Sequence, residues 1–213
     1  AEVLDDEVRR DLCPDKINTA QWLEVMEAAH SIGLRSTATI MFGHVDAPIH
    51  WARHLVRILE LQKQTGGFTE FVPLPFVHME APIFLKGKAR KGPTFRECVL
   101  MHAITRLVFN KEIPNIQASW VKLGPDGLLA CLQAGVNDVG GSLMNETITR
   151  SAGAAHGQEM LPETIEDLIR KAGRDPVQRT TLYGEPSDKE KAAKFGAPAL
   201  KANVNAPLKR APG

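Results

Sequence analysis

Imidazole, carboxylate and amide groups are concentrated in three short segments, and each segment follows a stretch with the pattern of a buried strand. In the second of them, His78 and Glu80 can bind a polar substrate or move a proton. In the third, the Gly140-Gly141 pair either lets backbone N–H groups approach an anion or makes a tight turn without a ligand. The three segments are Gly43-His44-Val45-Asp46, Pro75-Phe76-Val77-His78-Met79-Glu80 and Gly140-Gly141-Ser142-Leu143-Met144-Asn145-Glu146.

Two further histidines have the spacing of a metal pair on a helix. His50 and His54 are four residues apart and can present two imidazoles to one ion, with His44 or Asp46 nearby. The zinc-hydrolase pattern requires Glu directly after the first histidine, and Trp51 occupies that position. We therefore predict packed or surface histidines here and no metal ligand in this chain.

The three cysteines Cys13, Cys98 and Cys131 are far apart and form neither a CxxC nor a CxxxCxxC spacing. Cys98 and Cys131 fall among the apolar positions of predicted helices, which is typical of small buried side chains. An odd number of cysteines without an apolar signal segment indicates a reducing, cytoplasmic setting. An iron–sulfur cluster would have to take its ligands from outside this sequence.

Strand and helix patterns alternate along residues 1–186, and the alternation predicts how these segments are positioned. Short apolar runs predict four strands, and apolar residues at helical spacing predict the helices between and after them. The predicted strands are 36–42, 68–74, 115–120 and 136–139, and the predicted helices are 18–32, 48–65, 95–109, 126–134 and 163–171.

Four strand–helix units with short links indicate an α/β fold with parallel strands and crossover helices. Because the chain has no dinucleotide-binding glycine loop, a (β/α) barrel of the TIM type fits better than a doubly wound sheet. A closed barrel needs eight strands, so we predict the second half of one. Half a barrel leaves two sheet edges open, and either a missing first half or a partner must complete it.

Composition limits the class of protein. The chain has 213 residues, 43% hydrophobic and 24% charged, with a net charge of +1, which is typical of a globular protein and gives no general nucleic-acid footprint. No apolar run is long enough to span a membrane. Residues 187–213 are basic, rich in alanine and proline and poor in large apolar side chains, so we predict a disordered tail after a domain at 1–186, and no nucleic-acid arm.

Three longer stretches that contain the polar segments resemble a known family. They are similar to the carboxyl-terminal part of the FO synthase family of radical S-adenosylmethionine enzymes, and to its tyrosine-using half in particular. The resemblance covers about residues 1–186. Related menaquinone-pathway enzymes share much of the first and last stretches and remain an alternative. The stretches are Thr37-Ala38-Thr39-Ile40-Met41-Phe42-Gly43-His44, Pro73-Leu74-Pro75-Phe76-Val77-His78-Met79-Glu80-Ala81-Pro82 and Asn137-Asp138-Val139-Gly140-Gly141-Ser142-Leu143-Met144-Asn145-Glu146.

The resemblance implies a radical SAM barrel that makes the deazaflavin of coenzyme F(420). In such an enzyme a 4Fe-4S cluster reduces S-adenosyl-L-methionine to a 5'-deoxyadenosyl radical, which abstracts hydrogen from tyrosine. The Cα–Cβ bond of tyrosine then breaks, and the 4-hydroxybenzyl fragment adds to 5-amino-6-(D-ribitylamino)uracil. The expected partners are these small molecules and the amino-terminal half of the same enzyme.

The resemblance also implies roles for particular residues. Thr39-x-Met41-x-Gly43-x-x-Asp46 is similar to the family motif GxIxGxxE, in which the apolar residue packs on the adenine of the cofactor. Met41, Gly43 and Asp46 are the implied cofactor-binding positions, although Thr39 replaces the first glycine and Asp46 the glutamate. The implied substrate-side residues are His78, Glu80, Asn145 and Glu146.

The family's cluster motif CxxxCxxC is missing from this sequence, so we expect the chain to be inactive alone. We expect the motif upstream, in four more strand–helix units. Two other classes stay open: a non-catalytic half-barrel that docks on another subunit, and an ordinary aldolase- or hydrolase-type barrel. The last class needs a lysine or a metal at a strand end, and Lys122 lies just past one strand.

Overall fold

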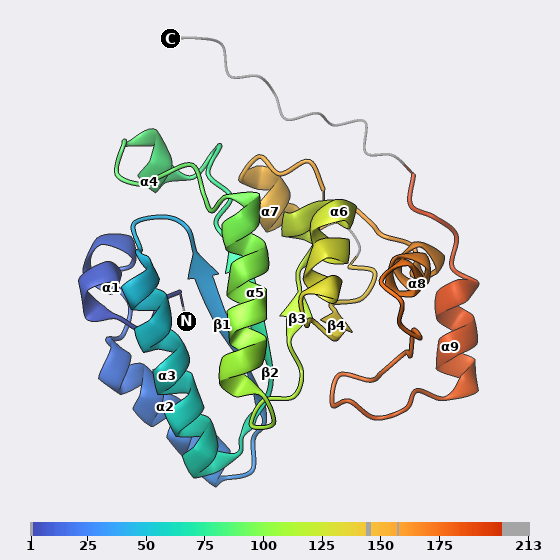
Figure 1. The fold of residues 1–213 in the computed structure, drawn as a ribbon, viewed down its shortest axis with the longest axis horizontal. Helices are drawn as coiled ribbons and strands as arrows, with labels where there is room; N and C mark the ends of the chain where they lie inside the picture. The colour runs from blue at the N-terminus through green and yellow to red at the C-terminus, as the bar shows by residue number, and fades with distance from the viewer. Residues whose placement is uncertain (1, 144–145, 157, 202–213) are drawn as a thin grey trace.

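The computed structural model describes residues 2–143, 146–156 and 158–201. Strands and helices alternate through its middle, as expected (Figure 1). The strands are β1 (Ser36–Phe42), β2 (Phe68–Pro75), β3 (Gln117–Ala118) and β4 (Asp138–Val139). The helices are α1 (Asp6–Leu12), α2 (Thr19–Ser31), α3 (Pro48–Thr65), α4 (Pro82–Leu85), α5 (Phe95–Phe109), α6 (Trp120–Gln133), α7 (Thr147–Ser151), α8 (Pro162–Lys171) and α9 (Asp188–Phe195).

All strand pairs are parallel. β1 pairs with β2 from Ser36 opposite Phe68 to Phe42 opposite Pro75, and β3 pairs with β4. A parallel bridge between Phe71 and Ile116 connects the two pairs, so the strands follow the order β1-β2-β3-β4. This confirms the predicted α/β fold with parallel strands, and the described residues form an open sheet and no closed barrel.

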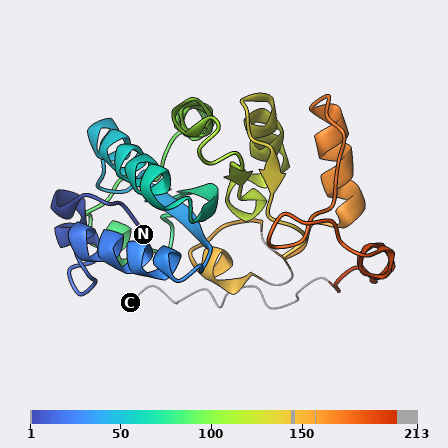
Figure 2. The ribbon, with the colours of Figure 1, turned by 90° about the horizontal axis from the view of Figure 1, so that it is seen from below.

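Helices α3, α5, α6 and α8 stand in an arc along one side of the strands (Figure 2). The alternation of β1 explains this, because Ala38, Ile40 and Phe42 are fully buried while Thr39 and Met41, which point to the other side, are only partly buried. On the helix side, Phe71 packs against Phe109 with ring centroids 4.8 Å apart, and Phe42 packs against Trp51 at 5.6 Å. Each such buried side chain contributes about 1.5–3 kcal/mol.

Local sequence signals set the ends of the long helices. Pro48 begins α3, and Gly66 ends it with a φ of 60°, a left-handed conformation that favours glycine. Thr94 caps α5, and its side chain and that of Glu97 bond each other's backbone N–H in a capping box. The hydrogen bond from Arg90 holds the pKa of Glu97 at about 2. These two helices match the predicted bounds 48–65 and 95–109.

The third strand–helix unit differs from the expectation. Strand β3 is only Gln117–Ala118, and the following helix begins at Trp120 instead of residue 126. Gly124 (φ 67°, ψ 179°) interrupts α6, so a separate turn at 120–123 precedes the main helix. Trp120 Nε1 donates to the Gly141 carbonyl at 2.8 Å and holds this turn at the end of the sheet. The short helices α1 and α4 also lie outside the sequence expectation.

The carboxyl-terminal segment contains more local structure than expected. Within residues 187–213, Ser187 caps helix α9 through a capping box with Glu190, and α9 contacts α8. Residues 202–213 lie outside the described residues, so the disorder expected for that part stays a prediction. None of the helices within the described ranges is long and apolar enough to cross a bilayer.

The amino-terminal residues lie beside the free edge of β1. Met41 N–H donates to the Glu2 carbonyl at 2.8 Å, and Leu4 N–H donates to His54 Nδ1 at 2.9 Å. Val3 and Leu4 are fully buried in the core. The chain before α1 therefore lies against the edge of β1 opposite β2.

Candidate functional site

The loops that follow the four strands are tied together at the carboxyl end of the sheet. Phe76 N–H donates to the Phe42 carbonyl at 2.9 Å, joining the loops after β1 and β2. Glu80 N–H donates to the Ala152 carbonyl at 3.1 Å, joining the loop after β2 to the end of α7. Because the carboxyl ends of parallel strands share one edge of the sheet, the predicted polar segments meet there.

Asp46 organises the turn after β1. Its buried carboxylate accepts hydrogen bonds from the backbone N–H groups of Gly43 (2.9 Å) and His44 (2.6 Å) and from the indole N–H of Trp51. Gly43 has a φ of 94°, and a Cβ there would lie 2.3 Å from Pro93 Cδ, so only glycine fits. The carboxylate therefore acts on this chain's own backbone, and Met41 stays half-buried on the uncovered face of the sheet.

His44 is a neutral structural histidine. Its Nδ1 accepts the Val45 N–H at 2.7 Å, so its Nε2 carries the proton and donates to the Met41 carbonyl at 2.9 Å. Burial lowers the pKa of His44 in spite of the nearby Asp46 carboxylate. His44 therefore stabilises the turn in its uncharged form.

The loop after β2 presents His78 and Glu80. The imidazole of His78 is half-buried and packs edge-on against Phe84, with ring centroids 4.6 Å apart. Glu80 is exposed, and neither side chain has a hydrogen-bond partner among the described residues. Met79 packs on Gly153, where a Cβ would lie 2.6 Å from that of Met79. Two titratable groups are thus displayed on a loop whose backbone is held in place.

The loop after β4 brings Glu146 to the same end. Its carboxylate caps α7, because the Thr149 N–H donates to both oxygens at 3.2 and 2.9 Å. Asn145, the other predicted substrate-side residue in this loop, lies outside the described residues.

Lys122 is the charged residue that the sequence-predicted site leaves out. It lies in the turn at 120–123 directly after β3 and is half-buried, and its ammonium has no hydrogen-bond or ion-pair partner among the described residues. Burial lowers the pKa of its ammonium, and the charge of Glu146 acts in the opposite direction. Its position just past a predicted strand end was the available signal.

The opposite end of the sheet is closed by side chains that bond one another. We call Glu70, Asp138, Arg179 and Tyr183 the amino-end cluster. Arg179 Nε and Nη2 donate to the Asp138 carboxylate at 2.9 and 2.5 Å, and the Tyr183 hydroxyl contacts the carboxylates of Glu70 and Asp138. Burial and these hydrogen bonds raise the pKa of Tyr183. Arg179 also stacks 4.1 Å from the Tyr183 ring.

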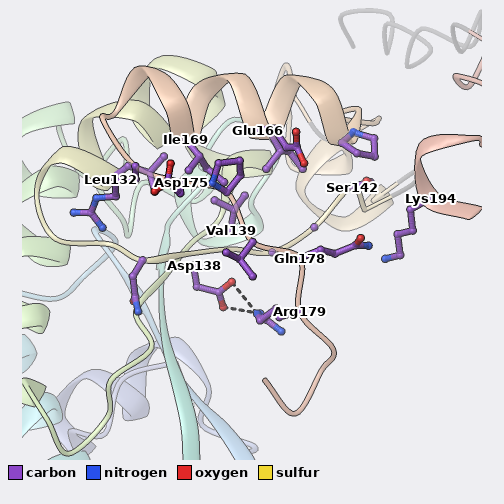
Figure 3. A pocket seen from close by; sticks show the side chains of 18 of the residues that line it. Leu132, Asp138, Val139, Ser142, Glu166, Ile169, Asp175, Gln178, Arg179 and Lys194 are labelled. Carbon is purple, nitrogen blue, oxygen red and sulfur yellow. Dashed lines mark hydrogen bonds and ion pairs between the residues drawn. The ribbon is translucent and has the colours of Figure 1, made fainter. Parts of the chain in front are cut away.

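A cavity of about 580 Å³ lies along β4, between α8 and the segment 174–183 (Figure 3). Val139 and Ser142 line it on the side of β4, Ile165 and Ile169 on the side of α8, and the Asp138–Arg179 pair lies at its floor. The cavity therefore follows the edge of β4 that β3 does not cover and reaches Gly140, Gly141 and Ser142 in the loop after β4.

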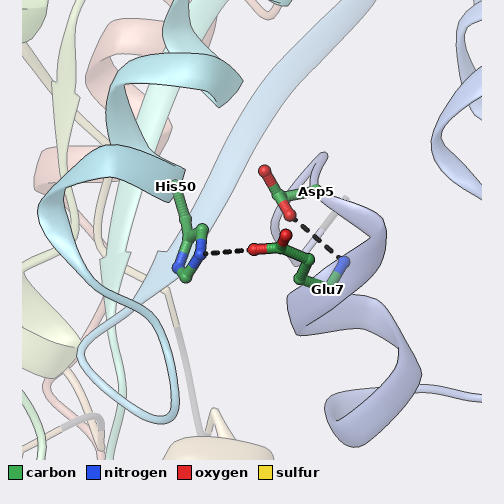
Figure 4. Close-up of side chains that lie close together, drawn as sticks. All are labelled: Asp5, Glu7 and His50. Carbon is green, nitrogen blue, oxygen red and sulfur yellow. Dashed lines mark hydrogen bonds and ion pairs between the residues drawn. The ribbon is translucent and has the colours of Figure 1, made fainter.

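The histidine pair of α3 does not form a metal site. His54 accepts the Leu4 N–H, and its burial lowers its pKa to about 3. His50 accepts the Ala47 N–H and lies 3.3 Å from Glu7 (Figure 4). The group Asp5, Glu7 and His50 has metal-like proximity. Arg53 Nη1 lies 3.1 Å from Asp5 and already compensates its charge, so the group is an ion-pair network.

The cysteines are buried, as predicted for Cys98 and Cys131, and all three are free. Burial raises the pKa of Cys98 to about 11 and that of Cys131 to about 12, so these thiols are protonated and unreactive. They are not positioned as ligands of one cluster.

Comparisons with known proteins identify the relatives of this chain. Residues 65–192 match the family described as CofH/MqnC C-terminal region. The chain is 52% identical over 183 residues to a 5-amino-6-(D-ribitylamino)uracil–L-tyrosine 4-hydroxyphenyl transferase of Methanopyrus kandleri, covering 86% of this chain and 50% of the relative. It is 51% identical over 197 residues to an FO synthase of Streptomyces avermitilis, covering 91% of this chain and 22% of that protein. The chain thus spans about half the length of the archaeal relative.

Proposed function

The chain belongs to the CofH/MqnC C-terminal region family, and we propose that it is the carboxyl-terminal part of a radical SAM enzyme of FO synthesis. The proposed reaction transfers the 4-hydroxybenzyl group of tyrosine to 5-amino-6-(D-ribitylamino)uracil, a step toward coenzyme F(420). The observation that carries the proposal is the identity of about half of all aligned residues with relatives named for this reaction. The free, protonated cysteines fit the proposed cytoplasmic setting.

We propose that the sheet is the second half of a TIM-type barrel. Its parallel strand order and its row of helices on one face support this. The cavity beside β4 supports it too, because a strand added to the free edge of β4 would lie between α8 and the segment 174–183. The proposed barrel domain comprises residues 1–186, and the additional strands come from an amino-terminal half.

The residues present fit part of an S-adenosylmethionine site. Met41 lies near the carboxyl end of β1 on the face that the helix row leaves uncovered, where an adenine can pack on its side chain. Asp46 fits a supporting role, since its carboxylate fixes Gly43 and His44. When bound and reduced, the cofactor supplies the radical that starts the reaction.

The residues present do not fit an iron–sulfur cluster. Cys13, Cys98 and Cys131 are buried at separate places, and burial raises the pKa of each thiol. A cluster needs several accessible thiolates within one loop or site. We therefore assign the cluster ligands to the amino-terminal half and derive no step through the cluster.

This chain's own contribution is to the substrate side. We propose that His78 and Glu80, on the fixed loop after β2, bind the polar substrates or transfer a proton, and that Glu146 and Asn145 also bind substrate. The loops that carry His78, Glu80 and Glu146 lie at the end of the sheet at which barrel enzymes place their chemistry.

The proposal is tested with this chain and with a chimera in which it replaces the matching half of the Methanopyrus kandleri relative. Both are reconstituted with iron, sulfide and reductant, and 5'-deoxyadenosine is measured with S-adenosylmethionine and tyrosine. The expected result is tyrosine-dependent 5'-deoxyadenosine from the chimera and none from the chain alone. Turnover by the chain alone, or a folded, iron-loaded chimera without turnover, would contradict the proposal.

A further inference from the structure

A half-buried cation and a carboxylate lie on neighbouring loops at the carboxyl end of the sheet. We propose that Lys122 and Glu146 bind the two charged ends of an α-amino acid, Lys122 the carboxylate and Glu146 the ammonium. The inference rests on the proposed function, in which the amino acid substrate is tyrosine, and it adds Lys122 to the substrate site.

The backbone around Lys122 holds it at the end of the sheet. Gly124 separates the turn at 120–123 from the main part of α6. The indole of Trp120 fixes this turn to the loop after β4 through the Gly141 carbonyl. Residue 124 has to be glycine, because its φ of 67° and ψ of 179° lie in a region that only glycine adopts readily. The interruption therefore places Lys122 over the strand ends, ahead of the main helix.

The environment of Lys122 lacks the bonds that a structural lysine normally has. The Lys122 ammonium has no hydrogen-bond or ion-pair partner in the described ranges, although the residue is half-buried. A partly buried ammonium without a partner in the described chain is available to an anionic ligand. A bound carboxylate would supply the missing partner.

Glu146 keeps capacity for a second partner. Among the described residues, only the Thr149 N–H is donated to its carboxylate, which offers about four lone-pair positions. Its charge already acts on the Lys122 ammonium, so the two groups are electrostatic neighbours. A pair of opposite charges on two neighbouring loops is complementary to a zwitterion.

Tyrosine and the methionyl part of S-adenosylmethionine both carry this zwitterion. The implied adenine contact, Met41, lies on β1, whereas Lys122 follows β3, two strands further along the sheet. Strands are spaced about 4.8 Å apart, so the two residues are separated by about 10 Å across the sheet. This separation favours tyrosine as the ligand of Lys122 and Glu146.

The test compares ligands that lack one charge each. Binding of L-tyrosine, of tyramine, which lacks the carboxylate, and of 3-(4-hydroxyphenyl)propanoate, which lacks the ammonium, is measured by calorimetry on the reconstituted chimera. Lys122→Met is expected to weaken tyrosine binding about 10- to 100-fold and to leave tyramine binding unchanged, the size of a lost charge-assisted hydrogen bond. Glu146→Gln is expected to weaken the binding of tyrosine but not that of the propanoate, which has no ammonium. The loop should keep its fold, since Gln still accepts the Thr149 N–H.

Two controls make the outcome specific. Lys122→Arg keeps the charge and should retain most of the tyrosine affinity, and Lys86→Met removes an exposed lysine after α4 and should change nothing. The inference would be overturned if Lys122→Met weakened the binding of tyrosine and of tyramine equally, or if it weakened the binding of S-adenosylmethionine instead. Unchanged tyrosine KM in an active Lys122→Met chimera would overturn it too and leave the proposed function standing. If the wild-type chimera neither binds nor consumes tyrosine, both this inference and the proposed function are wrong.

Discussion

At the amino ends of the strands, Arg179 and Tyr183 bond the carboxylates of Glu70 and Asp138, whereas at the carboxyl ends Lys122 and the loop after β2 display charged groups without partners in the described chain. Both ends are rich in polar side chains. The difference lies in whether the chain itself supplies the partner. Groups bonded within the chain stabilise the fold, and groups left without a partner are available to a ligand.

The backbone at the amino-end cluster supports this interpretation. Tyr183 has a φ of 63°, in the left-handed region that non-glycine residues rarely adopt. Such a conformation persists only where surrounding contacts stabilise it, and here the hydroxyl of Tyr183 is held by two carboxylates. The segment 174–183 is therefore fixed by long-range bonds from the sheet.

The largest expected effect comes from breaking the ion pair of the amino-end cluster. Arg179→Met leaves Asp138 buried without its cation and should lower the free energy of unfolding by about 2–4 kcal/mol, below the full value for a buried pair because Arg179 is 26% exposed. Urea denaturation measures it. The control is Arg170→Met, which removes exposed ion pairs on α8 and should cost less than about 1 kcal/mol. Equal losses of unfolding free energy in the two variants would show that the amino-end cluster stabilises the fold no more than an exposed ion pair does.

A smaller loss is expected when only the hydroxyl is removed. Tyr183→Phe keeps the ring under Arg179 but takes away the hydrogen bond to the carboxylates, which should cost about 1.5–3 kcal/mol. Thermal and urea unfolding at neutral pH give the value. A variant as stable as the wild type would show that the two carboxylates are satisfied without Tyr183.

The pH dependence of stability is expected to come from two histidines in the core under the helices, and not from either end of the sheet. Burial lowers the pKa of His54 to about 3 and that of His102 to about 4, from about 6.5 in the unfolded chain. At a pH between the folded and unfolded pKa values, the unfolded state binds more protons than the folded state. The contribution of each histidine to the free energy of unfolding is therefore complete above pH 6.5. It falls by about 1.4 kcal/mol per pH unit as the pH drops below that value. The slope of unfolding free energy against pH should therefore decrease in His102→Met. A slope equal to that of the wild type would contradict the assignment.

The smallest effect on stability is expected at the carboxyl end. Lys122→Met removes a half-buried lysine whose ammonium has no partner in the described chain. The free energy of unfolding should therefore stay the same or rise, and the change should be less than about 1 kcal/mol. The same urea titration decides it. A loss as large as that of Arg179→Met would make Lys122 a structural residue.

The sequence predicts the elements that have strong local signals. Pro48 and Gly66 bound α3, and the Thr94–Glu97 capping box begins α5, as expected. Strand β3 was placed less well, because its pairing covers two residues and the turn at 120–123 has the same apolar character as a strand. Local pattern carries no information on such a short parallel contact.

The amino-end cluster could not be predicted from local pattern. Tyr183 is the only tyrosine in the chain, and its partner Glu70 lies 113 positions earlier. Likewise, the resemblance implies a cofactor-binding position for Asp46 but could not show that its carboxylate bonds the backbone of its own turn. The polar segments identified the end of the sheet, but the division between bonded and available groups required the long-range contacts.

We propose that the carboxyl end of the sheet performs the chemistry and that the amino end stabilises the fold. The most direct measurement is the rate of tyrosine-dependent product formation per folded molecule in the chimera, with Lys122→Met and Tyr183→Phe compared side by side. The account predicts at least a tenfold fall in kcat/KM for Lys122→Met and a change below about threefold for Tyr183→Phe. The reverse order would contradict it.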